Sequence, residues 1–142
     1  MRILGVDFGD RNVGLALSDP LGITAQPLMT YRLSGGEENA RFFLELVRKH
    51  DVAEIVVGLP VRLDGTPGRR TEKTREFARW LEETLGLPVS FYDERLTTRQ
   101  ALQFMKGQRI KNRERRSVEN QISASLILDS YLESRRKRGH GC

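Results

Sequence analysis

The sequence predicts an α/β domain with a mixed five-stranded sheet, three antiparallel strands followed by two parallel ones, and helices on both faces. Two observations predict it. Apolar runs over 2–8, 13–18 and 23–33 come first and are separated by turn residues, which is typical of antiparallel strands. The later apolar runs over 53–58 and 87–92 each follow a segment with helical periodicity, and crossovers of this kind join parallel strands.

The helices are predicted from apolar spacing and from capping residues. Apolar residues within 40–47 follow the i, i+3, i+4, i+7 pattern of an amphipathic helix. A second helix is expected between Thr71, as its N-cap, and Gly86, which ends it. A short helix is expected over 97–107, and a last helix over 117–135 with Ser117 as its cap. In the third strand, Pro27 indicates a bulge or a sheet edge.

Length and composition indicate one globular domain. The chain has 142 residues, of which 38% are hydrophobic and 30% charged, a balance that separates it from disordered and membrane-spanning chains. We expect a single domain over 1–138 and a disordered tail over 139–142. The one cysteine, Cys142, cannot form an internal disulfide. Without a signal-peptide pattern after Met1, a cytoplasmic location is expected.

The charge is unevenly distributed. Lysine and arginine number 24 against 19 aspartate and glutamate, which gives a net charge of +5. Much of the excess lies in 109–116 (RIKNRERR) and 135–138 (RRKR). Basic clusters of this kind favour nucleic-acid binding. The alternative is a solvated surface with a basic tail.

Two carboxylates follow strands that are expected to be neighbours. Asp7 ends the first strand and Glu94 follows the last, and parallel strands end at the same edge of a sheet. Two nearby carboxylates repel each other, and a divalent cation relieves that repulsion. Oxygen ligands favour Mg²⁺ or Mn²⁺, whereas zinc would favour His or Cys, and neither His50 nor His140 is well placed. The alternative for Asp7 is a turn or strand-end carboxylate without a ligand.

Four segments carry a family resemblance. They are Asp7-Phe8-Gly9, VVGLP (56–60), DERLTT (93–98) and ISASLILDSYL (122–132). Together, in this order and at these distances, they resemble the YqgF/RuvX family. The resemblance implies a ribonuclease H-like fold related to the RuvC resolvases, and a nuclease that uses two divalent ions. It also implies a role in maturing the 5′ end of the small-subunit ribosomal RNA precursor, with Holliday-junction resolution as the alternative.

The resemblance also assigns roles to Asp7 and to residues of the DERLTT segment (93–98). Asp7 would bridge both ions and Glu94 would bind one of them. Arg95 would contact phosphate, Thr97 would cap the following helix, and Thr98 would bind the substrate backbone. A salt bridge and helix caps are the structural alternatives for these three residues.

The third ligand position departs from the family pattern. The family has an aspartate near the start of the last helix, and alignment on ASLILDSYL places Asn120 there. Helical spacing puts Asn120 on one face with Ala124 and Ile127, and this is the face expected to turn toward the sheet. Asn120 is therefore the expected ligand, and the adjacent Glu119 is the alternative. The SAS sequence over 123–125 is expected to permit close packing of the helix on the sheet.

Two basic segments are expected to contact phosphates. The first is the loop over 62–70, with Arg62, Arg69 and Arg70, and the second is 109–116, with Arg109 and Lys111. A solvated loop is the alternative for the first segment. The aromatic residues near position 80 are expected to pack in the core and not to stack on bases.

The sequence thus predicts a phosphodiester-cleaving nuclease with Mg²⁺ or Mn²⁺, acting on an RNA precursor or on branched DNA, as a monomer or homodimer. A junction resolvase would need a symmetric dimer to cut two strands. A ribosome-assembly factor that binds nucleic acid without catalysis is the alternative from another class, and Asn120 favours it. An ATPase of the sugar-kinase type is disfavoured, because such enzymes need two domains of this kind.

Overall fold

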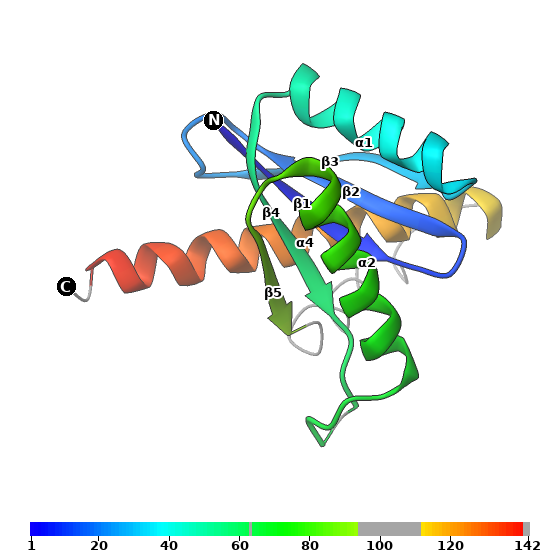
Figure 1. The fold of residues 1–142 in the computed structure, drawn as a ribbon. Helices are drawn as coiled ribbons and strands as arrows, with labels where there is room; N and C mark the ends of the chain where they lie inside the picture. Colours follow the sequence, from blue (N-terminus) through cyan, green and yellow to red (C-terminus); the bar gives the residue numbers. More distant parts are fainter. Residues whose placement is uncertain (63, 94–111, 141–142) are drawn as a thin grey trace.

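A five-stranded sheet forms the centre of the molecule (Figure 1). The computed structural model describes residues 1–62, 64–93 and 112–140, and within the last helix the side chains of 118–136. The strand order is β3-β2-β1-β4-β5. The strands are β1 (Arg2–Phe8), β2 (Asn12–Ser18), β3 (Ala25–Arg32), β4 (Val52–Leu59) and β5 (Val89–Asp93). β1, β2 and β3 pair antiparallel, whereas β4 and β5 run parallel to β1, so the predicted mixed sheet is confirmed.

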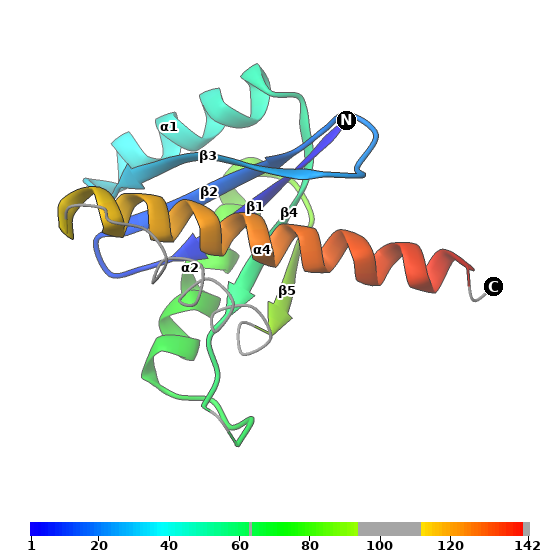
Figure 2. The same cartoon turned by 180° about the vertical axis from the view of Figure 1, so that it is seen from behind.

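Helices cover both faces of the sheet, as predicted. α1 (Gly36–Lys49) and α2 (Arg69–Leu85) lie on one face, and α4 (Asn112–His140) crosses the other (Figures 1 and 2). Each face has its own core of buried apolar side chains. None of the helices in the described part of the chain is both long and apolar enough to cross a membrane.

Side chains of β1 alternate between the two cores. Leu4 and Val6 are fully buried under α1 and α2, whereas Ile3 belongs to the core under α4. Because successive residues of a strand point to opposite faces, Gly5 and Asp7 lie on the α4 face together with Ile3. The strand therefore directs its only carboxylate toward the long helix.

The aromatic residues of α1 and α2 pack inward. Phe77 stacks on Phe8 with ring centroids 4.4 Å apart, and Trp80 meets the edge of the fully buried Phe43 at 6.1 Å. Aromatic pairs in this geometry stabilise a core beyond the area that they bury. The prediction that these side chains serve packing is confirmed.

The start of α2 differs from the prediction. Gly68, and not Thr71, is the N-cap, so the helix begins at Arg69, three residues earlier than predicted. The Thr71 hydroxyl accepts a hydrogen bond from the Gly68 N–H at 3.0 Å and donates one to the Pro60 carbonyl. Thr71 is the third residue of the helix, and its hydroxyl satisfies the N–H of the N-cap residue Gly68. Its side chain therefore caps the helix from inside and not from the N-cap position. At the other end, Gly86 adopts φ 66° and ends the helix as predicted.

The last helix is longer than predicted. α4 begins at Asn112, five residues before the expected cap Ser117, and runs to His140, past the expected end at Arg135. The segment 112–116, which precedes the expected cap, is therefore helical. Its arginines and glutamate are good helix formers, and no glycine or proline interrupts the run before Gly139. The helix expected over 97–107 lies outside the described residues.

The third strand has both features that Pro27 indicated, an edge position and an irregular register. β3 is an edge strand, and its pairing with β2 shifts register between Leu15 and Ala16, directly where Ala16 faces Pro27. Proline has no N–H to donate to a sheet ladder, so an edge position next to an irregular register suits it.

Candidate functional site

The parallel strands end at one edge of the sheet, called here the carboxyl edge. β1, β4 and β5 reach it at Phe8, Leu59 and Asp93 (Figure 1). Asp7 is the next-to-last residue of β1 and its side chain is partly buried. In a sheet of this kind, ligands bind beyond the carboxyl ends of the parallel strands. Asp7 therefore occupies the predicted position for chemistry.

Asn120 packs on Gly14, the residue that pairs with Asp7. In the antiparallel pairing of β1 and β2, Asp7 lies opposite Gly14. A Cβ atom on Gly14 would overlap the backbone carbonyl of Asn120 and would stand 3.0 Å from the Asn120 Cβ. Since residues opposite each other on paired strands share a face, the Asp7 side chain lies on the α4 face, where Asn120 covers the neighbouring Gly14. The predicted inward face of the last helix is confirmed.

The same close packing continues along α4. A Cβ atom on Gly5 would approach the Leu128 Cβ to 2.8 Å and the Ala124 carbonyl oxygen to 2.9 Å. Ala124, Ile127 and Leu128 are fully buried. Two strand glycines thus let the helix backbone rest on the sheet, and this contact sets how deeply Asn120 packs on Gly14.

Several predicted site residues lie outside the described residues. These are Glu94, Arg95, Thr97, Thr98, Arg109 and Lys111. Glu119 is described and is partly buried in α4, one position before Asn120. In the described ranges, no three His, Cys, Asp or Glu side chains lie close enough together to hold a metal ion.

The donors at Asp7 and Asn120 suit a hard cation. Asp7 offers a carboxylate and Asn120 an amide carbonyl, and both are oxygen ligands of the kind that Mg²⁺ and Mn²⁺ accept. His50, at the end of α1, belongs to another part of the fold. The residues at the carboxyl edge therefore fit a Mg²⁺ or Mn²⁺ ion and do not fit zinc.

The arginines of the first basic segment gather near the start of α2. Arg69 and Arg70 form its first turn and are exposed. The Arg62 Nε atom lies 3.3 Å from the position of a Cβ on Gly68, the N-cap of the same helix. A tight turn holds Arg62 there, because its N–H donates to the Thr66 carbonyl at 2.9 Å. The structure thus brings the three predicted arginines of this segment to one place.

One cation was missed by the sequence analysis. Lys73 forms an ion pair of 3.8 Å with Asp10, in the turn that follows β1. Together with Arg70 and Thr74 it lines a small hollow against Phe8 and Gly9. Lys73 lies one helical turn after Arg70, so the i, i+3 spacing was the available signal. The contact links the basic end of α2 to the end of the strand that carries Asp7.

Gly14 was the second feature missed. A glycine inside an apolar strand marks a close approach of another backbone, and the VGLALS segment carries this signal. Only the pairing register shows that the approach occurs opposite Asp7.

The sequence of this chain matches a family of known proteins along most of its length. The family model described as "RuvX: Holliday junction resolvase" matches residues 1–134. A protein of Syntrophus aciditrophicus named "Putative pre-16S rRNA nuclease" is 46% identical over 94% of this chain and 89% of its own length. Proteins of the same name from Moorella thermoacetica and Lachnospira eligens are 46% and 43% identical, over 94% and 96% of this chain and 95% and 100% of their own lengths.

Solved structures share the fold. Thermus thermophilus RuvC in complex with a Holliday junction substrate has a TM-score of 0.55 at 16% identity, covering 96% of both chains. The fowlpox virus resolvase bound to Holliday junction DNA has a TM-score of 0.53 at 15% identity, covering 94% of this chain and 98% of that one. These likenesses show that the sheet and its helices form a RuvC-like ribonuclease H fold. With the match over residues 1–134 and relatives above 40% identity, the chain belongs to the RuvX family.

Proposed function

We propose that this chain is a metal-dependent nuclease that hydrolyses phosphodiester bonds in the 5′ region of the small-subunit ribosomal RNA precursor. The observation that carries the proposal is the packing of Asn120 on Gly14, the residue that pairs with Asp7 at the carboxyl edge. The relatives at 40–46% identity, which carry the name "Putative pre-16S rRNA nuclease", support the substrate. The single cysteine, which cannot form an internal disulfide, supports a cytoplasmic location.

The metal site would use Asp7, Asn120 and Glu94. A pair of divalent ions there would supply a nucleophilic water and would stabilise the leaving oxygen. Asp7 would bridge the ions, Glu94 would bind one, and the Asn120 carbonyl would complete the set. Glu119 is the alternative third ligand. Asn120 brings no negative charge, so the set holds cations more weakly than three carboxylates would.

The basic end of α2 would hold the substrate backbone. A helix N-terminus already carries partial positive charge, and Arg69 and Arg70 add two cations to it. A phosphate bound there would neutralise the charges of both arginines. Arg62 lies beside the same N-cap. From the segments outside the described residues, Arg95, Thr98, Arg109 and Lys111 are proposed to extend this contact.

Branched DNA is the second candidate substrate. The family description and the resolvase folds favour it. A resolvase would act as a homodimer, whereas RNA maturation allows a monomer. A cleavage assay on precursor RNA, single-stranded DNA and a four-way junction of matched length tests the choice. We expect the RNA to be cleaved fastest; preferential cutting of the junction would favour the resolvase, and binding without cleavage of any substrate would favour an assembly factor.

Charge removal at Arg69 and Arg70 is expected to weaken RNA binding irrespective of sequence. For single strands, each lost phosphate contact should reduce the slope of log affinity against log salt by about 0.7. The double variant Arg69→Gln/Arg70→Gln is measured by fluorescence anisotropy across a salt series. Arg79→Gln, an exposed arginine farther along α2, is the matched control and should leave the slope unchanged. An unchanged slope in the double variant would show that both arginines are solvated surface only.

The substitution Asn120→Asp is expected to tighten metal binding, because it adds the missing negative charge to the ligand set. Cleavage should then reach half its maximal rate at about tenfold lower Mg²⁺. Wild-type activity should favour Mn²⁺, which accepts less ideal ligand sets than Mg²⁺. Rates are measured across a titration of each metal, with Glu119→Gln as the adjacent control. A neutral Asn120→Asp together with an inactive Glu119→Gln would assign the third ligand to Glu119.

A further inference from the structure

A second hollow lies at the edge of the sheet opposite Asp7. Its volume is about 420 Å³, within the range of pockets that bind ligands or peptide side chains. The starts of β1 and β4, the β2–β3 loop and the second half of α4 form its walls. Arg2, Leu21, Ala53, Leu132 and Arg136 are among its lining residues. This hollow, called here the distal hollow, is separated from Asp7 by about 17 Å of strand β1.

Large apolar side chains gather around the distal hollow. Met1 is 79% exposed, Leu21 81% and Ile23 51%. In the described part of the chain the other exposed large apolar side chains are Leu44 and Phe91, each at 41%. Exposed apolar side chains that cluster beside a hollow are typical of protein-binding sites.

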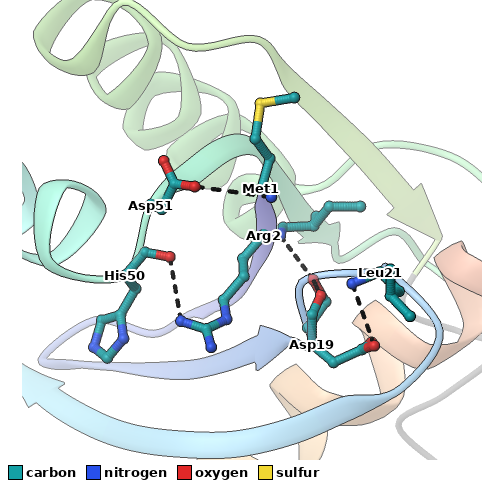
Figure 3. A network of polar contacts seen from close by, with 8 residues as sticks. Met1, Arg2, Asp19, Leu21, His50 and Asp51 are labelled. Carbon is teal, nitrogen blue, oxygen red and sulfur yellow. Dashed lines mark hydrogen bonds and ion pairs between the residues drawn. The ribbon is translucent and has the colours of Figure 1, made fainter.

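The β2–β3 loop holds these side chains outward. The Asp19 carboxylate accepts hydrogen bonds from the N–H groups of Leu21, Ile23 and Thr24, at 3.3, 2.7 and 2.8 Å. These bonds, the one from Thr24 first, keep the pKa of Asp19 below its ordinary value. Figure 3 shows the hydrogen bond that the Leu21 N–H donates to the Asp19 carboxylate. The loop is thus ordered by its own backbone, and a partner would meet Leu21 without having to order it first.

Arginines surround the apolar side chains. Arg136 donates to the Ile23 carbonyl at 2.8 Å and so ties α4 to the loop. Arg2 donates to the His50 carbonyl at 3.5 Å (Figure 3). Arg135 pairs with Glu54, which also accepts a hydrogen bond from the Tyr131 hydroxyl at 3.2 Å. A guanidinium has five N–H donors, so these contacts leave donors on Arg2 and Arg136 for an incoming carboxylate.

We propose that the distal hollow binds a peptide segment of a partner protein, with an apolar anchor side chain beside Leu21 and carboxylates at Arg2 and Arg136. The charge of the rim fits this occupant: within the described ion pairs Arg135 is neutralised by Glu54, whereas Arg2 and Arg136 have no acidic partner there. The sequence adds two further cations directly after Arg136. An acidic segment is attracted to such a rim.

Nucleic acid is a poorer fit. Proteins that read single-stranded RNA commonly stack its bases on aromatic side chains, and Met1, Leu21 and Ile23 offer no ring. Between Asn120 and Arg136, moreover, α4 exposes the acidic Asp129 and Glu133. A strand running along the helix from the carboxyl edge would meet the negative charge of Asp129.

Phage display on the full-length chain tests the proposal. Random dodecamer peptides are selected on the immobilised wild type and, in parallel, on Leu21→Ser. We expect the wild type to enrich sequences that combine an apolar anchor with acidic residues, and Leu21→Ser not to enrich them. The most enriched peptide is then synthesised, and its affinity is measured by fluorescence anisotropy. Leu21→Ser and Arg136→Glu should each weaken it by about tenfold or more.

Two control variants match the test variants. Leu44→Ser and Arg41→Glu make the same changes on the exposed side of α1, away from the distal hollow, and should keep wild-type affinity. Nuclease activity of Leu21→Ser should be unchanged, which separates this proposal from the proposed function. Enrichment of basic peptides, no enrichment at all, or equal binding by Leu21→Ser would overturn the proposal. The proposal would also be overturned if Arg136→Glu lost RNA binding while it still bound the peptide as the wild type does. Loss of self-association in Leu21→Ser, with the peptide still bound, would overturn it too.

Discussion

Replacing Gly14 with valine is expected to displace α4 from the sheet and to lower the free energy of unfolding by about 3 kcal/mol or more. The new Cβ would overlap the Asn120 backbone, and a helix backbone cannot move aside as a flexible side chain can. Strand propensity alone predicts the opposite sign, because valine favours strands and glycine does not. Denaturant unfolding with a guanidinium series measures the change. Nuclease activity should fall with the displacement of Asn120.

A second glycine provides the control for that substitution. Gly36 lies at the start of α1, and a Cβ there would meet nothing within 4 Å. Gly36→Ala should therefore be neutral or slightly stabilising. If Gly14→Val were as stable as the wild type, α4 would not rest on β2 as described, and the placement of Asn120 on Gly14 would be wrong.

The substitution Asp7→Asn is expected to lower the cleavage rate by at least about a hundredfold while RNA affinity stays within a fewfold of the wild type. Loss of residues that only support metal ligands already costs 10–100-fold, so loss of a bridging ligand costs at least as much. The melting temperature should be unchanged or higher, because the substitution removes the expected repulsion between the Asp7 and Glu94 carboxylates. Single-turnover cleavage, anisotropy and thermal melting measure the three quantities.

Asp129→Asn is the matched control for Asp7→Asn. It makes the same chemical change at an exposed position of α4, outside the carboxyl edge. Its cleavage rate should equal that of the wild type. Full activity of Asp7→Asn would remove Asp7 from the proposed metal site, and a large loss of stability would show instead that its role is structural.

The sheet could be predicted because its strands differ in pattern and connection. Short turns between the first strands and helical crossovers between the later ones are local signals, and they determine direction and order. Helix ends were less predictable. Thr71 has the side chain of an N-cap, yet the carbonyl of Pro60 and the N–H of Gly68 hold its hydroxyl inside the helix. Such tertiary partners leave no trace in local spacing.

The candidate site was predictable only in part, because local spacing shows the face of a helix but not its tertiary contacts. Helical spacing placed Asn120 on the inward face of α4, because Ala124 and Ile127 mark that face. The contact of Asn120 with Gly14, and the ion pair between Asp10 and Lys73, join segments that are distant in the sequence. Neither could be derived without the pairing register of β1 with β2 and the position of α2.

The central claim is that Asp7 at the carboxyl edge binds a divalent cation. The most direct test is the binding of Mn²⁺, measured by electron paramagnetic resonance without nucleic acid, in the wild type, Asp7→Asn and Asp129→Asn. We predict that the wild type and Asp129→Asn bind Mn²⁺ alike, and that Asp7→Asn binds it at least about tenfold more weakly. Equal Mn²⁺ affinity in the wild type and Asp7→Asn would contradict the claim.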